Sequence, residues 1–171
     1  MQRETMSDTS IDRAQQLCRI GLNKQARGDL KAAKRLFRQS LALHETAEAW
    51  CYLGWCRSLS GRLAQAVSHC RRAIAVDPEF GNAYNDLGAY LVELGHADDA
   101  VVWFERAKNA SRYDTPQFPY LNLARVHIAR ARFSQALLEL QAARVIAPMD
   151  QRIEELVAYV GLVMAQERKA A

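Results

Sequence analysis

The sequence contains few residues that interrupt helices and no long hydrophobic run. Only four prolines and eight glycines occur among 171 residues, so most of the chain is free to adopt helical backbone. The longest apolar stretch near its end, residues 156–165, is well short of the roughly 18 residues of a membrane-spanning helix. The segment 1–11 has no apolar run of the secretory-signal type. We therefore expect no membrane span and a cytoplasmic location.

The sequence also lacks the motifs that carry catalysis or bind cofactors. It contains no glycine-rich phosphate loop, nucleophile elbow or zinc-protease motif. Its four cysteines form no Cys-x-x-Cys pair, which favours free thiols in a reducing compartment. Cys18 and Cys51 could approach each other, but no histidine or carboxylate completes a metal-ligand set with them. We therefore expect neither an enzyme nor a resident cofactor or metal.

The net charge of +4 is unevenly distributed. Residues 1–46 contain nine Lys/Arg and five Asp/Glu, whereas residues 81–116 contain three and six. The basic residues that gather in the first segment are Lys24, Arg27, Lys31, Lys34, Arg35 and Arg38. A cluster of this size is usually a solvated surface, so the sequence disfavours nucleic acid as the partner but keeps it as an alternative. Opposite charges in the two segments also allow weak head-to-tail self-association.

What the sequence does contain is an internal repeat. Three ladders of small residues advance along the chain in the same steps of 33, 34 and 36 residues. The ladders are Gly21, Gly54, Gly88 and Ala124; Ala33, Ala66, Ala100 and Ala136; and Ser40, Ala73, Ala107 and Ala143. Three ladders in register indicate four copies of one supersecondary unit, and each copy needs a neighbour to bury its apolar face.

Each copy has the pattern of two helices joined by a tight turn. Apolar residues recur at intervals of three and four, which is the spacing of one helix face. Gly28, Gly61 and Gly95 interrupt the first three copies midway, and Ala131 stands at the corresponding place in the fourth. Glycine readily adopts the left-handed conformation that ends a helix. We therefore expect helices of about 12–14 residues on each side of the turn.

The positions shared by the copies resemble the tetratricopeptide repeat. The second copy contains Trp50, Leu53, Gly54, Ala66, Cys70 and Pro78, and the third contains Tyr84, Leu87, Gly88, Ala100 and Phe104. Arg57 departs from the family pattern where a large apolar residue is usual, and Arg112 departs from it where proline is usual. The chain also resembles small bacterial tetratricopeptide proteins of unassigned function. The resemblance implies an all-α solenoid of four helical hairpins with a C-terminal capping helix.

The repeat divides the chain into a short start, an array and a closing helix. We expect a flexible segment at residues 1–10, an array over 11–150, and a capping helix with its tail at 151–171. The four hairpins are expected at residues 14–46, 47–80, 81–116 and 117–150. Pro119 belongs in a first helical turn, where its missing N–H is tolerated. The fourth hairpin therefore begins near Gln117.

By resemblance to the family, the first helix of each hairpin lines a concave face that holds partner peptides. The residues expected on that face are Leu22, Cys51, Trp55, Leu59, Asn82, Asn85, Val92, Leu121, Arg125 and Ile128. Trp55 is the candidate anchor, because tryptophan dominates interfaces when it fills a pocket. Asn82 and Asn85 could bond to a peptide backbone, and Arg125 could bind an acidic group.

Some of these side chains could equally belong to the core. Leu22, Leu59 and Val92 recur at helical spacing, which core residues share, and the two asparagines could be solvated polar residues. One subgroup of the family grips the C-termini of chaperones with lysine and asparagine in the groove. This chain has Cys18 and Leu22 at the matching places, so that clamp is absent.

The sequence thus predicts an adaptor or scaffold that binds another protein, as a peptide or an amphipathic helix, in an apolar concave groove. A secretion-type chaperone for an exported partner is an alternative, although such chaperones usually carry fewer repeats. A further alternative is the binding of nucleic acid or an acidic surface through the basic first hairpin. In that case affinity would fall steeply with salt.

Overall fold

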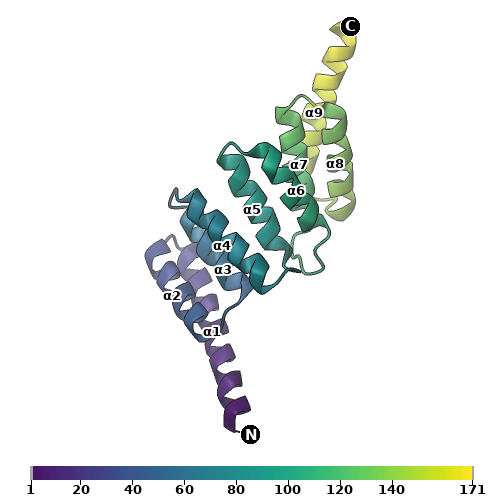
Figure 1. The fold of residues 1–171 in the computed structure, drawn as a ribbon. Helices are drawn as coiled ribbons and strands as arrows, with labels where there is room; N and C mark the ends of the chain where they lie inside the picture. The colour runs from purple at the N-terminus through teal and green to yellow at the C-terminus, as the bar shows by residue number, and fades with distance from the viewer. Residues whose placement is uncertain (1, 171) are drawn as a thin grey trace.

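The structure, a computed structural model, describes the backbone of residues 2–170 and the side chains of residues 9–169. Within this part of the chain it contains nine α-helices and no strand. The helices are α1 (Gln2–Ala26), α2 (Leu30–Leu43), α3 (Ala47–Ser58), α4 (Leu63–Val76), α5 (Gly81–Glu93), α6 (Ala97–Lys108), α7 (Phe118–Ala129), α8 (Phe133–Ile146) and α9 (Gln151–Ala170). Helices α1 to α8 form four hairpins that stack in chain order, and α9 packs on the last (Figure 1). The predicted all-α solenoid of four hairpins with a capping helix is confirmed.

Helix α1 is longer than the sequence suggested. A flexible segment was predicted at residues 1–10, but helical backbone already begins at Gln2. Residues 2–10 contain neither glycine nor proline, so their backbone chemistry does not end the helix. The purple end of α1 consequently extends beyond the stacked hairpins (Figure 1). Met1 itself lies outside the described residues.

Left-handed residues end the first helix of every hairpin, as the glycine spacing predicted. Gly28, Gly61 and Gly95 have φ of +79°, +71° and +85°, and Ala131 takes the same place in the fourth hairpin with φ of +54°. In all four turns, the amide of the left-handed residue donates a hydrogen bond to a carbonyl of the preceding helix, at 2.8–3.0 Å. In the third hairpin, the Gly95 amide donates to the Val92 carbonyl at 3.0 Å. A side chain in this conformation costs about 1–2 kcal/mol. The fourth hairpin therefore carries a strain that the other three avoid.

Small residues inside the hairpins let large rings pack directly against helix backbone. In the third hairpin, a Cβ added to Gly88 would lie 2.6 Å from the Phe104 ring, which is fully buried. The first hairpin repeats this arrangement with its own glycine and phenylalanine. The second hairpin differs, because the smaller Cys70 occupies the place of the ring. A Cβ added to Gly54 would meet no atom closer than 3.4 Å, so glycine is not required there.

The connection between α6 and α7 is anchored to the connection between α4 and α5. The Gly81 amide donates to the Arg112 carbonyl at 2.9 Å, and the Arg112 guanidinium forms ion pairs with Asp77 and Glu48. Arg112, which stands in place of the usual proline, thus ties the third hairpin to the second. A Cβ added to Gly81 would lie 2.6 Å from Tyr113. The missing side chain therefore lets Tyr113 lie against the start of α5.

The fourth hairpin and α9 close the array. Pro119 lies in the first turn of α7 and Gln117 is its N-cap, as the proline predicted. In α9, Ile153 and Val160 are fully buried against the fourth hairpin, as expected of a capping helix. Among the helices that the structure describes, none is both long and apolar enough to cross a bilayer.

Candidate functional site

The first helices of the four hairpins lie beside one another. Helix α3 contacts α1 and α5, and α5 contacts α7, so the four helices form one continuous surface. We call it the first-helix face. Three pockets follow one another along it, and neighbouring pockets share a residue: Tyr52 lines the first and second, and Glu93 lines the second and third. The face therefore offers a row of recesses to a bound chain.

The middle recess, which we call the central pocket, has a volume of about 420 Å³ and lies between α3 and α5. It brings together five of the residues that the sequence placed on the concave face: Cys51, Trp55, Leu59, Asn82 and Asn85. It also contains residues that the sequence did not single out, namely Tyr52, Phe80, Asp86, Tyr90, Tyr113 and Thr115. Half of the ten predicted site residues thus converge on one pocket.

The α3 wall of the central pocket is apolar and open to solvent. Trp55 is 47% exposed and Leu59 is 56% exposed, so neither contributes to the core. The structural role of tryptophan in this hairpin belongs to Trp50, whose ring stacks on His69 at a centroid distance of 5.3 Å. Trp55 and Leu59 are therefore free to contact a ligand, and that role remains a prediction.

The α5 wall of the central pocket is polar. Asn85 is largely buried, and its side-chain oxygen accepts a hydrogen bond from Asn122 at 2.9 Å, which links α5 to α7. The side-chain oxygen of Asn82 is buried without a hydrogen-bond partner among the described residues. Burial raises the pKa of Asp86 to about 7, against the opposing effect of a hydrogen bond with Asn85. This wall thus contains hydrogen-bond acceptors that are only partly satisfied by other residues of the fold.

The other predicted residues are distributed over the two flanking pockets and the core. Leu22 is half-buried and lines a pocket of about 420 Å³ between α1 and α3. Val92 and Arg125, both exposed, line one of about 260 Å³ between α5 and α7. Cys51 lines the central pocket but is only 3% exposed, so its contribution there is mainly steric.

The prediction for Leu121 was wrong, because its side chain is buried in the core. Leu121 is 1% exposed and packs in one cluster with Leu140 and Ile153. Ile128 is half-buried and packs against the same cluster. The physical reason is that α7 packs against α8 within its hairpin, and the cluster continues to α9. Apolar residues of α7 that could have faced a groove are therefore used to attach the end of the array.

The sequence missed Asp86 and the aromatic lining of the central pocket. Asn82, Asp86 and Tyr90 follow one another at four-residue intervals on α5, which is a recognisable stripe of one helix face. That signal was available in the sequence. Tyr113 comes from the α6–α7 connection, and its position depends on contact with Gly81. No local sequence pattern predicts a contact between residues so far apart in the chain.

The four cysteines are free thiols. Cys18 lies 3.2 Å from the Ser40 hydroxyl. A hydrogen bond with Cys70 and burial together raise the pKa of Cys51 well above its ordinary value. The neighbour of Cys51 is thus Cys70 of the same hairpin. Burial also raises the pKa of Cys56 to about 11, so these buried thiols stay protonated and weakly reactive at neutral pH.

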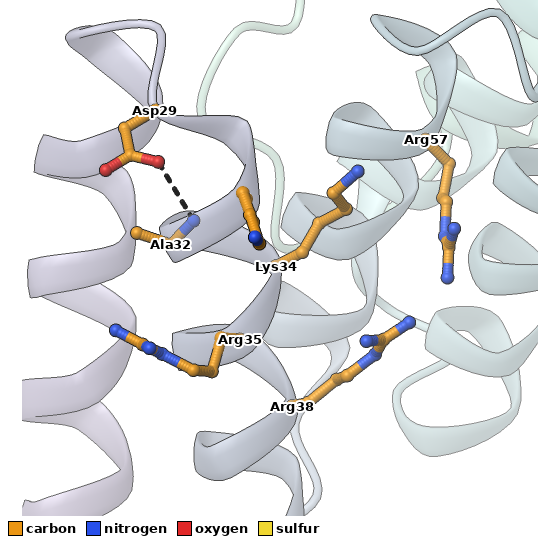
Figure 2. Close-up of a pocket in the computed structure, with 7 residues that line it drawn as sticks. Asp29, Ala32, Lys34, Arg35, Arg38 and Arg57 are labelled. Carbon is orange, nitrogen blue, oxygen red and sulfur yellow. Dashed lines mark hydrogen bonds between the residues drawn. The ribbon is translucent and has the colours of Figure 1, made fainter.

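A separate recess, lined mainly by the first hairpin, is strongly basic. This basic pocket has a volume of about 640 Å³ and is lined by Asp29, Lys31, Ala32, Lys34, Arg35, Arg38 and Arg57. Figure 2 shows Lys34 and Arg38 extending from α2 toward the side on which Arg57 lies, while Arg35 points the other way. The one carboxylate of the lining, Asp29, accepts the Ala32 amide at 3.0 Å as a helix cap.

Positive charge in the basic pocket is not neutralised by neighbouring side chains. Among the described residues, none of its lysines or arginines forms an ion pair. The Nε atom of Arg57 is buried without a partner. Burial and the nearby Arg38 and Arg62 lower the pKa of Arg57. An anion in this pocket would relieve mutual repulsion among the cations.

Comparisons with known proteins agree with this architecture. The family model described as "Tetratricopeptide repeat" matches residues 47–80, which contain the second hairpin. The cell division cycle protein 27 homolog of Caenorhabditis elegans is 33% identical over 107 residues, which are 63% of this chain and 13% of that protein. The chain thus spans only about an eighth of the length of this curated relative.

Solved structures of similar shape extend the agreement to nearly the whole chain. PilF of Pseudomonas aeruginosa has a TM-score of 0.80 at 20% identity, covering 99% of this chain and 72% of that one. YrrB, described as a TPR protein with an unusual peptide-binding site, has a TM-score of 0.65 at 16% identity, covering 90% and 79%. At these identities the likeness establishes the fold.

Proposed function

We propose, from the premise that this chain is a tetratricopeptide-repeat protein, that it binds a segment of another protein along its first-helix face. Proteins of this fold serve as scaffolds for protein–protein interaction, and YrrB is described as having a peptide-binding site. The observation that carries the proposal is the exposure of Trp55 and Leu59 beside a formed pocket. Large apolar side chains that do not stabilise the fold indicate an interaction site.

The geometry favours an apolar side chain of the partner against Trp55. A tryptophan that becomes fully buried at the centre of an interface commonly contributes about 2 kcal/mol or more to binding. This corresponds to roughly a thirtyfold change in affinity. The flanking pockets at Leu22 and at Val92 continue the row on both sides. A peptide or an amphipathic helix could place successive side chains in these recesses.

The test is affinity capture from the native lysate with matched variants. Wild type, Trp55→Ala and the control Leu138→Ala are immobilised side by side, and retained proteins are identified by mass spectrometry. Leu138 is 67% exposed on α8, away from the first-helix face. Its substitution therefore removes exposed apolar surface, as Trp55→Ala does, but at a different place. We expect a protein that wild type and Leu138→Ala retain and Trp55→Ala releases. Its affinity for purified wild type should exceed that for Trp55→Ala by at least about tenfold.

Equal capture by all three forms would move the binding site away from Trp55. Circular dichroism of each variant shows whether the helices are intact, so that loss of binding is not confused with loss of fold. A partner that Leu138→Ala releases and Trp55→Ala retains would place the site on the second helices instead.

The basic pocket supports a second candidate function, the binding of an acidic ligand such as nucleic acid or an acidic protein surface. The supporting observation is the convergence of Lys34, Arg38 and Arg57 without a neutralising carboxylate. We expect a labelled single-stranded RNA to bind wild type with an affinity that falls steeply between 50 and 200 mM salt, by about tenfold or more if several phosphates are contacted. Arg57→Gln should weaken binding, whereas the exposed Arg71→Gln on α4 should not. Salt-independent binding would exclude this function.

A further inference from the structure

The central pocket contains an acidic group that lacks a cationic partner. Asp86 lies on α5 and lines the pocket, and no Lys, Arg or His among the described residues forms an ion pair with it. Asp86 is half-buried, and partial removal of a carboxyl group from water without a counter-charge is costly, which raises its pKa. The fold therefore tolerates an unfavourable group at this position and gains no visible stability from it.

Aromatic side chains form much of the remaining lining of the central pocket. Tyr52 and Trp55 come from α3, Tyr90 comes from α5, and Tyr113 comes from the α6–α7 connection. Aromatic faces attract cations, and a desolvated contact is worth more than an exposed one. An acidic group within an aromatic lining is suited to a positively charged ligand.

Further hydrogen-bond acceptors line the same pocket. The side-chain oxygen of Asn82 has no hydrogen-bond partner among the described residues, and the carboxylate of Glu93 also lines the pocket. No lysine or arginine lines this pocket, in contrast to the basic pocket on the first hairpin. The lining thus offers negative charge and hydrogen-bond acceptors to a ligand that supplies donors and positive charge.

We infer that the central pocket binds the guanidinium group of an arginine side chain in the partner segment, with Asp86 as its counter-charge. This inference rests on the proposed function, since it names a side chain of the bound segment. Guanidinium is planar, stacks on aromatic rings, is weakly hydrated and supplies five donors, which matches a lining of carboxylate, amide and aromatic groups. The apolar contact at Trp55 and the charged contact at Asp86 then lie on opposite walls of one pocket.

The experiment uses small probes and does not require the natural partner. N-acetyl-arginine methylamide is titrated into ¹⁵N-labelled full-length protein, and the citrulline analogue, which has the same shape without the charge, is titrated in parallel. We expect saturable shifts of the Trp55 indole N–H and the Asn82 side-chain amide with arginine. The citrulline analogue should bind at least about tenfold more weakly, in line with the greater strength of charge-assisted hydrogen bonds.

Matched variants assign the effect to Asp86. Asp86→Asn keeps the shape and removes the charge, and we expect it to weaken arginine binding at least about tenfold. Glu155→Gln removes an exposed carboxylate of α9 and should leave binding unchanged. The comparison of the two probes on wild type stands even if Asp86→Asn unfolds. A lysine derivative that binds as tightly as arginine would overturn the preference for guanidinium.

Equal binding of the arginine and citrulline probes, or no saturable shift in the central pocket, would overturn the inference. Its failure is distinguishable from failure of the proposed function. A partner that wild type retains and Trp55→Ala releases, together with inactive probes, would leave the proposed function standing and reject the arginine site. Active probes with equal capture by wild type and Trp55→Ala would support the arginine site and reject the Trp55-centred partner site.

Discussion

The second and third hairpins follow the same helical plan but present different chemistry to the first-helix face. Trp55 and Leu59 of α3 are exposed and apolar, whereas Ala89 and Glu93 stand 34 residues later at the equivalent places of α5. Both pairs line pockets on this face. Because these positions contribute little to the core, the two helices can differ there without loss of fold. Under the proposed function, the difference would give the two halves of the bound segment different chemical surroundings.

The same two hairpins also differ inside. The third packs the Phe104 ring against Gly88, whereas in the second the nearest neighbours of a Cβ on Gly54 are Ala66 and His69, and Cys70 stands at the repeat position of the ring. The tight ring contact in the third hairpin makes glycine obligatory, and the looser contact in the second does not. The same repeat position is therefore tightly packed in the third hairpin and loosely packed in the second. Substitution of the two glycines can measure this difference.

The largest effect is expected from removing the charge that distinguishes the third hairpin. The pKa of Asp86 is raised from 3.8 to about 7 by burial, so between these values the folded chain holds a proton that the unfolded chain has lost. The free energy of unfolding therefore falls as pH rises from about 4 to about 7. Asp86→Asn should remove this fall and raise the free energy of unfolding at pH 8 by about 2–4 kcal/mol over wild type.

Urea unfolding at pH 5 and pH 8 checks this expectation. The difference between Asp86→Asn and wild type should be larger at pH 8, and Glu155→Gln should follow wild type at both values. Asp77 and Asp150, whose pKa values are lowered by hydrogen bonds with Arg112 and Arg152, contribute equally to wild type and variant and therefore cancel. A variant that differs from wild type by the same amount at both pH values would contradict the assignment.

The internal difference between the hairpins predicts opposite responses to one added methyl group. Gly88→Ala would force a Cβ to 2.6 Å from the buried Phe104 ring, and we expect it to lower the free energy of unfolding by about 2 kcal/mol. Gly54→Ala meets its neighbours only at 3.4 Å and gains helix propensity, so it should change stability by less than about 1 kcal/mol. Thermal and urea unfolding of the two variants provide the measurement. Equal destabilisation would contradict the looser packing around Gly54.

The turns extend the comparison to the fourth hairpin. Ala131 has φ of +54°, whereas Gly95 serves the same turn of the third hairpin at φ of +85°. Ala131→Gly should raise the free energy of unfolding by about 1 kcal/mol, because glycine adopts this conformation without steric cost. Gly95→Ala is the reciprocal variant and should lower it by a similar amount. Opposite changes in the free energy of unfolding of the two variants, measured with urea, would support backbone strain at Ala131. A lower free energy of unfolding in Ala131→Gly would refute it.

The smallest effect on stability is expected at the residue with the largest proposed role in binding. Trp55 is 47% exposed, so Trp55→Ala should alter the free energy of unfolding by no more than about 0.5 kcal/mol. Trp50, which stacks on His69 and donates to Glu45 at 2.9 Å, provides the contrast; Trp50→Ala should cost about 2 kcal/mol or more. If both variants lose equal stability, Trp55 belongs to the core and its exposure has no functional meaning.

Much of the architecture could be read from local pattern. The midway glycines end helices because their backbone tolerates positive φ, and Pro119 begins α7 because its ring suits a first turn. These are properties of single residues, so a sequence states them directly. The helical start of α1 was not predicted, because a polar segment without glycine or proline is compatible with both helix and coil.

The candidate site could be read only in part. The resemblance to the repeat family that placed Trp55 and Leu59 on the first-helix face assigned Leu121 to the same face, but Leu121 is buried. Spacing gives the direction of a side chain relative to its own helix. It does not say whether another helix covers that direction, as happens at the end of the array, where Leu121 packs in one cluster with residues of α8 and α9.

The sequence alone determined the helices, their turns, the fourfold repeat and the helix face that carries Trp55, because each depends on backbone preference or on residues a few positions apart. Tertiary structure decided which of those side chains stay open, and it placed Tyr113 against Gly81 and Asp86 in an aromatic pocket without a cation. Such contacts join residues of different elements. Their energy depends on burial and on neighbours supplied by the whole stack, and local spacing does not encode either.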